Sequence, residues 1–235
     1  MPAVKATPET TSCPHHRRSL AATAYQTIYS KIISLQYQPG QHLEEATLVD
    51  ELGIGRTPIR EALQRLAADM LVESQPGKGF VVRPITLQNT KAAFAALQIL
   101  ELGVADLAVR QENRLLLEAM REANVQVAEA VSEMDIYRLV EANSTFHDAY
   151  ARCSDNIYLV LSLQKVRCET NRLAYLSFGN EIDPERNLKQ HYASVIDQHN
   201  GVIEALRDRD AERLKALIVE HIGIFKNRII HYLTE

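Results

Sequence analysis

The chain has 235 residues, of which 46% are hydrophobic and 24% charged, a composition typical of a globular protein with room for two modest domains. Its formal net charge of −4 would argue against a nucleic-acid-binding protein if that charge were evenly spread. However, residues 1–84 hold nine basic and eight acidic side chains, which leaves 17 basic and 22 acidic ones in residues 85–235. The acidity therefore belongs to the second part, and the first part can still bind DNA through locally displayed cations.

Further features exclude other classes of protein. The cysteines Cys13, Cys153 and Cys168 are odd in number and lack CxxC spacing, which disfavours a disulfide framework and a thiolate zinc site. No apolar run approaches the roughly 18 residues of a membrane span, and the N-terminal residues lack the apolar core of a signal peptide. We expect a soluble cytoplasmic protein without membrane contact.

Residues 1–18 are expected to form a disordered tail. They contain Pro2, Pro8 and Pro14 and show no periodic apolar pattern. The pair His15-His16 leaves metal binding open there, although solvated tail residues are the favoured interpretation.

Three short helices are predicted after the tail. Apolar residues recur at helical spacing in three stripes: Ala24, Ile28, Ile32 and Leu35; Leu48, Val49 and Leu52; and Ile59, Leu63 and Leu66. The turn Pro39-Gly40 ends the first helix, and Gly53-Ile54-Gly55 separates the other two. Thr57 is expected to cap the third helix, with Pro58 at its first position. Two short helices joined by a glycine turn predict a helix-turn-helix.

A β-hairpin is predicted next. The strand-like runs 71–74 and 80–82 flank the turn-rich segment 75–79, and Arg83-Pro84 stops the second run. This hairpin is the wing of a winged helix-turn-helix domain that we place at residues 19–84.

The remainder, residues 85–235, is predicted to be all-helical. Six helices are expected near 88–110, 113–131, 135–152, 156–178, 184–207 and 211–232, divided by Asn113, Ser132, Asp155-Asn156, Asp183-Pro184 and Asp208/Asp210. Their apolar stripes indicate an antiparallel helical bundle with a shared core. The fold class is therefore mainly α.

Candidate DNA contacts gather at the start of the third helix. Arg56, Thr57 and Arg60 lie where a recognition helix meets base edges, because arginine can bond guanine or grip a phosphate and the helix N-terminus favours anions. Lys78, between Gly77 and Gly79 at the wing tip, is expected to reach the adjacent backbone or minor groove. The alternative is a solvated helix face on which the arginines pair with Glu61 or Glu45.

Residues 21–84 resemble the winged helix-turn-helix of the GntR superfamily. The resemblance is carried by Pro39-Gly40, Leu43, Leu52-Gly53, Arg56-Thr57-Pro58-Ile59-Arg60-Glu61-Ala62-Leu63 and Gly77-Lys78-Gly79. In the FadR-like branch an arginine commonly contacts DNA early in the second helix, and Ala46 stands at that position here. Base specificity at one step is therefore expected to differ.

A metal site is predicted in the second domain. Asn143 and His147 are four residues apart and share one helix face. His199 and His221 are 22 residues apart, about 33 Å on one continuous helix. A hairpin turn at position 210 would instead bring them level. Three imidazoles and an amide oxygen suit a divalent ion such as zinc, with positions left open for a small ligand.

Residues 88–230 resemble the FadR C-terminal (FCD) ligand-binding domain. The matching residues are Asn143-Ser144-Thr145-Phe146-His147, Asp155-Asn156, His199, Glu204-Ala205-Leu206, Asp210 and His221. The resemblance implies a metal held by one carboxylate and three histidines, with zinc expected and nickel or manganese as alternatives, that binds a carboxylate-bearing metabolite. Asn143 occupies the aspartate position, which weakens the expected metal affinity. Leu97 replaces an arginine often found four residues before Glu101, so the effector is expected to differ.

Two arginines of the second domain allow two interpretations. Arg167 and Arg172 are candidates for binding an anionic effector or for surface ion pairs. His42, His191 and His231 follow no ligand pattern and are interpreted as structural or solvent-facing.

The leading hypothesis is a homodimeric transcription regulator that binds palindromic double-stranded operator DNA and responds to a small organic acid. One alternative is a metal-dependent hydrolase using the three histidines, although it lacks HExxH and an evident general base. The other is a helical scaffold, for which Arg56→Ala and Arg60→Ala would change nothing measurable.

Overall fold

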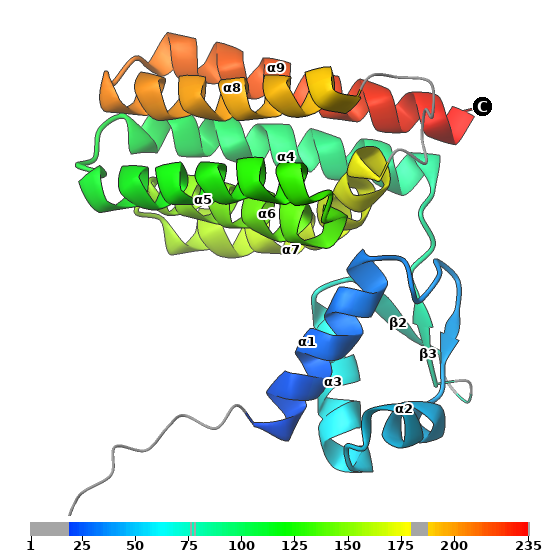
Figure 1. Ribbon diagram of the computed structural model, residues 1–235. Coiled ribbons are helices and arrows are strands. Elements are labelled where there is room, and N and C mark those ends of the chain that lie inside the picture. Colours follow the sequence, from blue (N-terminus) through cyan, green and yellow to red (C-terminus); the bar gives the residue numbers. More distant parts are fainter. Residues whose placement is uncertain (1–18, 76, 78, 180–187, 235) are drawn as a thin grey trace, which may run out of the picture.

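The computed structural model describes residues 19–75, 77, 79–179 and 188–234. A small domain of helices and a three-stranded sheet is followed by a bundle of long helices, and a short linker between β3 and α4 joins the two (Figure 1). The predicted mainly α class, with a winged helix-turn-helix and an all-helical second part, is confirmed. The expected tail 1–18 and the candidate Lys78 lie outside the described residues.

The small domain has the predicted three helices and wing. Its elements are α1 (Leu20–Ile33), β1 (His42–Leu43), α2 (Glu45–Leu52), α3 (Arg56–Ala68), β2 (Val72–Gln75) and β3 (Gly79–Val82). The strands are antiparallel in the order β1-β3-β2, and Ser74 pairs with Phe80 across the wing. Gly53 ends α2 in the left-handed conformation, with φ of 64°, as the glycine turn predicted.

Several predicted helix ends in this domain are wrong. Gly55 is the N-cap of α3 and the helix begins at Arg56, so Thr57 does not cap it. Pro58 is the third helical residue, where its missing N–H still costs nothing because the first four N–H groups have no intrahelical partner. Leu35 lies beyond the end of α1 in a turn with φ of 57°.

The bundle helices follow the predicted order. They are α4 (Leu87–Ala108), α5 (Arg114–Glu133), α6 (Ile136–Arg152), α7 (Ile157–Phe178), α8 (Leu188–Arg207) and α9 (Ala211–Thr234). α8 and α9 form an antiparallel pair over α4, with α5, α6 and α7 on the other side (Figure 1). Ser132 does not divide two helices as predicted, because α5 continues to Glu133 and Asp135 caps α6.

The bundle core surrounds the histidines. Its fully buried side chains include Phe94, Phe146, Tyr150, Leu163 and Ile218 from α4, α6, α7 and α9. The histidine region is therefore a polar cluster enclosed by an apolar core.

Among the described residues, no helix is long and apolar enough to span a membrane.

Candidate functional site

The first candidate site is the exposed start of α3. Arg56, Thr57 and Arg60 all face solvent, with the two arginine side chains 75% and 60% exposed. Ile59, between them, is fully buried and fixes the side of the helix that faces the core. The arginines are therefore displayed outward from a rigidly packed helix.

Glu45 at the start of α2 holds both arginines. Its Oε2 accepts a hydrogen bond from Nε of Arg56 and its Oε1 accepts one from Nε of Arg60, both at 2.9 Å. The hydrogen bond from Arg56 is the largest influence that lowers the pKa of the Glu45 carboxyl. Because each arginine uses only Nε, its terminal nitrogens remain available to DNA. The ion pair with Glu45, which the sequence analysis gave as the alternative to DNA contact, is thus formed, but the arginines stay exposed.

A groove of about 570 Å³ joins this helix start to the wing. It is lined by His42, Glu44, Glu45, Ala46, Arg56, Arg60, Gly77 and Gly79. Gly77 and Gly79 have φ of 74° and 81°, which L-amino acids with side chains rarely adopt. The predicted wing glycines and helix arginines therefore border one surface, and Ala46 contributes a small side chain to it.

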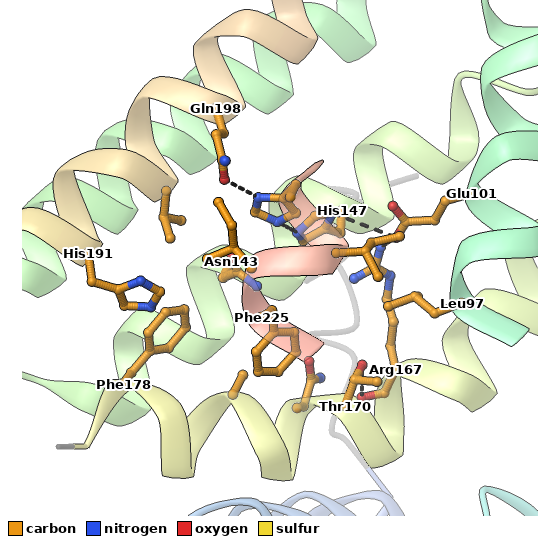
Figure 2. A pocket seen from close by; sticks show the side chains of 16 residues that line it. Leu97, Glu101, Asn143, His147, Arg167, Thr170, Phe178, His191, Gln198 and Phe225 are labelled. Carbon is orange, nitrogen blue, oxygen red and sulfur yellow. Dashed lines mark hydrogen bonds and ion pairs between the residues drawn. The ribbon is translucent and has the colours of Figure 1, made fainter. Parts of the chain in front are cut away.

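The second candidate site is a cavity inside the bundle. One ring nitrogen from each of His147 in α6, His199 in α8 and His221 in α9 lies within 4.8 Å of the other two. His199 and His221 do lie level with each other, as the turn between α8 and α9 predicted. Asn143 lines the same cavity beside His147 (Figure 2).

The outer nitrogens of two histidines are held by amide oxygens. Asn124 donates its Nδ2 to the Ile196 carbonyl and to Asn200, so its Oδ1 accepts from Nδ1 of His199 at 2.9 Å. Gln198 Oε1 likewise accepts from Nδ1 of His221 at 2.9 Å. Both protons therefore lie on Nδ1, which leaves a lone pair on Nε2 of each ring, and His147 donates from its Nε2 to Nε2 of His221.

These lone pairs are directed into the cluster. Nε2 of His221 lies 3.3 Å from Nε2 of His147, and among the described residues none bonds Nε2 of His199. Burial, followed by the charge of nearby Arg167, lowers the pKa of His221 to about 4. Burial likewise lowers the pKa values of His147 and His199. The three rings are therefore neutral near pH 7, the form that binds metal.

The arrangement fits a divalent ion. Histidine nitrogens around tetrahedral zinc lie about 3.4 Å apart when each bond is about 2.1 Å. The cluster already has one pair at 3.3 Å, and outer-shell acceptors on Nδ1 are the usual way in which ligating rings are oriented. His147, His199 and His221 would hold the ion, and Asn143 lies close by as a neutral oxygen donor.

Arg167 and Glu101 form a buried ion pair at one wall of the cavity. Arg167 Nη2 donates to Glu101 Oε1, and that oxygen lies 4.0 Å from Nδ1 of His147. Within the described part of the chain, Nε of Arg167 and Oε2 of Glu101 have no hydrogen-bond partner. Burial raises the pKa of Glu101, while Arg167 opposes that rise. The cavity, of about 40 Å³, therefore has in its wall an ion-paired arginine with one unbonded N–H.

Arg172 and His191 do not lie where the sequence suggested. Arg172 does not line the cavity: its guanidinium donates to the backbone carbonyl of Arg83 and to Glu169. His191, which no pattern singled out, lines the cavity next to Phe178, with ring centroids 5.9 Å apart.

Sequence reasoning missed the supporting residues Asn124 and Gln198. Nothing in the sequence marks an amide on one helix as the partner of a ring on another. For Gln198, its position directly before His199 was the one available signal.

Two family models match the chain. Residues 20–82 match the model described as bacterial regulatory proteins of the gntR family, and residues 92–223 match the model of the FCD domain. Both matches coincide with the two domains of the fold.

The relatives found by sequence are transcription regulators and not enzymes. The HTH-type transcriptional repressor RspR of Escherichia coli K12 is 22% identical over 198 residues, which is 84% of this chain and 83% of that protein. The Uxu operon transcriptional regulator of the same organism is 26% identical, covering 86% of this chain and 83% of that one.

Solved structures share the fold. E. coli McbR/YncC has a TM-score of 0.76 at 20% identity and covers 92% of this chain and 99% of its own. A putative GntR regulator from Rhodococcus sp. RHA1 has a TM-score of 0.72 at 20% identity, covering 90% and 98%.

Proposed function

Because the chain belongs to the GntR family of bacterial regulatory proteins and carries an FCD domain, it is a DNA-binding transcription regulator, and we propose that a small carboxylate bound with a divalent metal in the histidine cavity sets its operator affinity. The observation that carries this proposal is the convergence of three neutral imidazole nitrogens beside Arg167. When bound, the ion supplies a Lewis-acidic centre with open positions for an oxygen ligand. Zinc is the expected ion, with nickel or manganese as alternatives.

The DNA contacts are assigned to Arg56, Thr57 and Arg60 at the start of α3, with Gly77 and Lys78 of the wing. Support comes from the outward display of the arginines and from the groove that joins them to Gly77. Arg56 and Arg60 would reach guanine edges or phosphates, and Gly77 would permit close approach of the wing backbone. The protein would therefore act in the cytoplasm, where its operator lies.

A homodimer on a palindromic operator is part of this proposal. One winged module reads few base pairs, and twofold proteins match palindromic DNA. α4 and the start of α7, which pack together, expose the apolar side chains Ile99, Ile157, Tyr158 and Leu161. Exposed apolar side chains on two helices that pack together are suited to contact with a second copy. Ile99→Glu combined with Tyr158→Glu should lower the mass measured by light scattering from dimer to monomer.

The test of the proposed function measures operator binding by the metal-stripped protein. Fluorescence anisotropy of labelled DNA from its own promoter gives the operator Kd. Adding Zn²⁺ with a panel of small carboxylates should change the operator Kd, and His147→Ala should abolish that change while leaving metal-free binding intact. Arg56→Ala should weaken binding to the operator in every condition. If neither metal nor acid changes the Kd for the wild-type chain, the proposed regulation is wrong.

A further inference from the structure

The groups around the three histidines carry no negative charge of their own. An imidazole ligand supplies no negative charge, and Nδ1 of His199 and of His221 bonds an amide oxygen rather than a carboxylate. Asn143, which lines the cavity from α6, is also an amide. A divalent ion bound to these donors would therefore keep its full charge in a buried place, which is costly.

The nearby charged pair does not correct this imbalance. The carboxylate of Glu101 is already neutralised by Arg167, and both side chains are buried. Arg167 lines the same cavity as His147 and His221. A guanidinium in the cavity wall repels any further cation, including a metal ion.

The space and the free polar groups identify what would complete the site. The cavity has a volume of about 40 Å³, which is room for about three water molecules at roughly 10–15 Å³ each. A carboxylate group, with its three heavy atoms, is of similar size. Nε of Arg167 is buried and, in the described part of the chain, lacks a hydrogen-bond acceptor. A carboxylate is an acceptor for this N–H and a ligand for the metal at the same time.

We infer that metal and carboxylate bind here as a mutually dependent pair, because Asn143 leaves the site one negative charge short and the incoming acid supplies it. This inference rests on the function proposed above and deepens it: the protein responds to the acid and the ion together. By thermodynamic linkage, the factor by which the acid tightens metal binding equals the factor by which the metal tightens acid binding.

The experiment measures Zn²⁺ affinity of the metal-stripped full-length chain by competition with a fluorescent chelator. Sodium acetate is the probe, because it carries only the required carboxylate, fits the cavity and binds Zn²⁺ weakly in water; sodium chloride at equal ionic strength is the reference. Acetate should tighten Zn²⁺ binding by about tenfold or more, as expected for one added charge at short range.

Two substitutions of Asn143 separate the effect of a negative charge from the effect of losing the amide. Asn143→Asp supplies the negative charge from the protein, so this variant should bind Zn²⁺ tightly in chloride and gain less than about threefold from acetate. Asn143→Ala removes the amide without adding charge, so its binding should keep the acetate dependence of the wild type. Asn143 is partly exposed, and circular dichroism checks that both variants fold.

The outcomes separate this inference from the proposed function. Tight Zn²⁺ binding that is equal in acetate and chloride overturns the inference alone and leaves the metal-dependent regulator standing. Acetate dependence that persists in Asn143→Asp also overturns it. If ¹³C-acetate broadens in NMR spectra of the metal-free protein as much as with Zn²⁺, an anion site at Arg167 replaces the pair. Zn²⁺ affinity no higher than that of His147→Ala in either buffer defeats both ideas.

Discussion

Arg172 of α7 donates a hydrogen bond of 2.7 Å from Nη1 to the backbone carbonyl of Arg83, where the winged domain ends. The Arg172 side chain is fully buried, and its Nη2 donates to Glu169. The preceding residue, Asn171, lines the histidine cavity and donates to the hydroxyl of Tyr29 in α1 at 3.2 Å. Two consecutive residues of α7 thus connect the bundle, and its cavity, to the DNA-binding domain.

Arg172→Ala should destabilise the protein by about 3 kcal/mol, because it removes a fully buried cation and leaves the partly buried Glu169 carboxylate and the Arg83 carbonyl without their partner. Urea unfolding followed by circular dichroism measures the change. The control is Arg121→Ala, which removes an exposed ion pair with Glu118 and should cost less than about 1 kcal/mol. Equal losses for the two variants would show that the contact with Arg83 contributes little.

Tyr29→Phe should weaken communication between the domains. The substitution removes the oxygen that accepts from Asn171 but keeps the ring, so stability should fall by only about 1 kcal/mol. We expect a smaller effect of Zn²⁺ and carboxylate on the operator Kd, and faster hydrogen exchange in α1.

The matched control is Tyr25→Phe. The Tyr25 ring stacks on Tyr29, but its hydroxyl donates to Asp69 within the winged domain. This variant should lose similar stability and keep the full effect of metal and acid. If both variants respond alike, the bond between Asn171 and Tyr29 does not carry the coupling.

Much of the fold follows from local pattern. The stripe of Ile59, Leu63 and Leu66 and the glycine at position 53 predicted α3 and the turn before it, because burial and positive φ impose those residue types. β1 was not predicted, since two residues have no periodicity and His42 and Leu43 become a strand only by pairing with β3. Its formation depends on tertiary structure.

The site was predicted in part for the same reason. His199 and His221 could be placed level with each other because a hairpin fixes the relation of two helices. Arg167 and Arg172 could not be distinguished, because the sequence gives no rotation for α7 relative to its neighbours. Five residues correspond to a rotation of about 140°, so one side chain points to the cavity and the other to Arg83.

Glu45→Gln should reduce operator specificity. Glu45 fixes the directions of Arg56 and Arg60, so its loss should weaken operator binding by about tenfold through disorder of those side chains. Binding to random DNA should instead tighten slightly, because a negative charge near the phosphates is removed. Anisotropy titrations on both DNAs at several salt concentrations give the specificity ratio.

Glu61→Gln is the control for the loss of one negative charge near the DNA. Glu61 is exposed on α3, the helix that carries Arg56 and Arg60, and its loss removes one negative charge while the Glu45 contacts remain. Affinity for both DNAs should rise together and the specificity ratio should stay constant. A matching loss of specificity in Glu61→Gln would mean that charge, rather than side-chain position, explains the effect of Glu45.

The metal-free protein should lose stability as the pH falls from about 6.5 to 4. Burial, assisted by Arg167, holds the pKa of His221 at about 4, whereas an unfolded histidine has a pKa of about 6.5. The unfolded chain therefore binds more protons within this window, so the free energy of unfolding decreases as the pH is lowered. His221 alone should contribute about 2 kcal/mol between pH 7 and pH 5.

Urea unfolding at those two pH values, in the presence of a chelator, measures this dependence. His221→Asn should reduce the difference in unfolding free energy by about 2 kcal/mol, because asparagine takes up no proton. His42→Asn, on the exposed side of β1, is the control for replacing a histidine outside the cavity. If His221→Asn keeps the full pH dependence of the wild type, the ring is protonated in the folded protein, and a site that requires it as a neutral ligand would not form near pH 5.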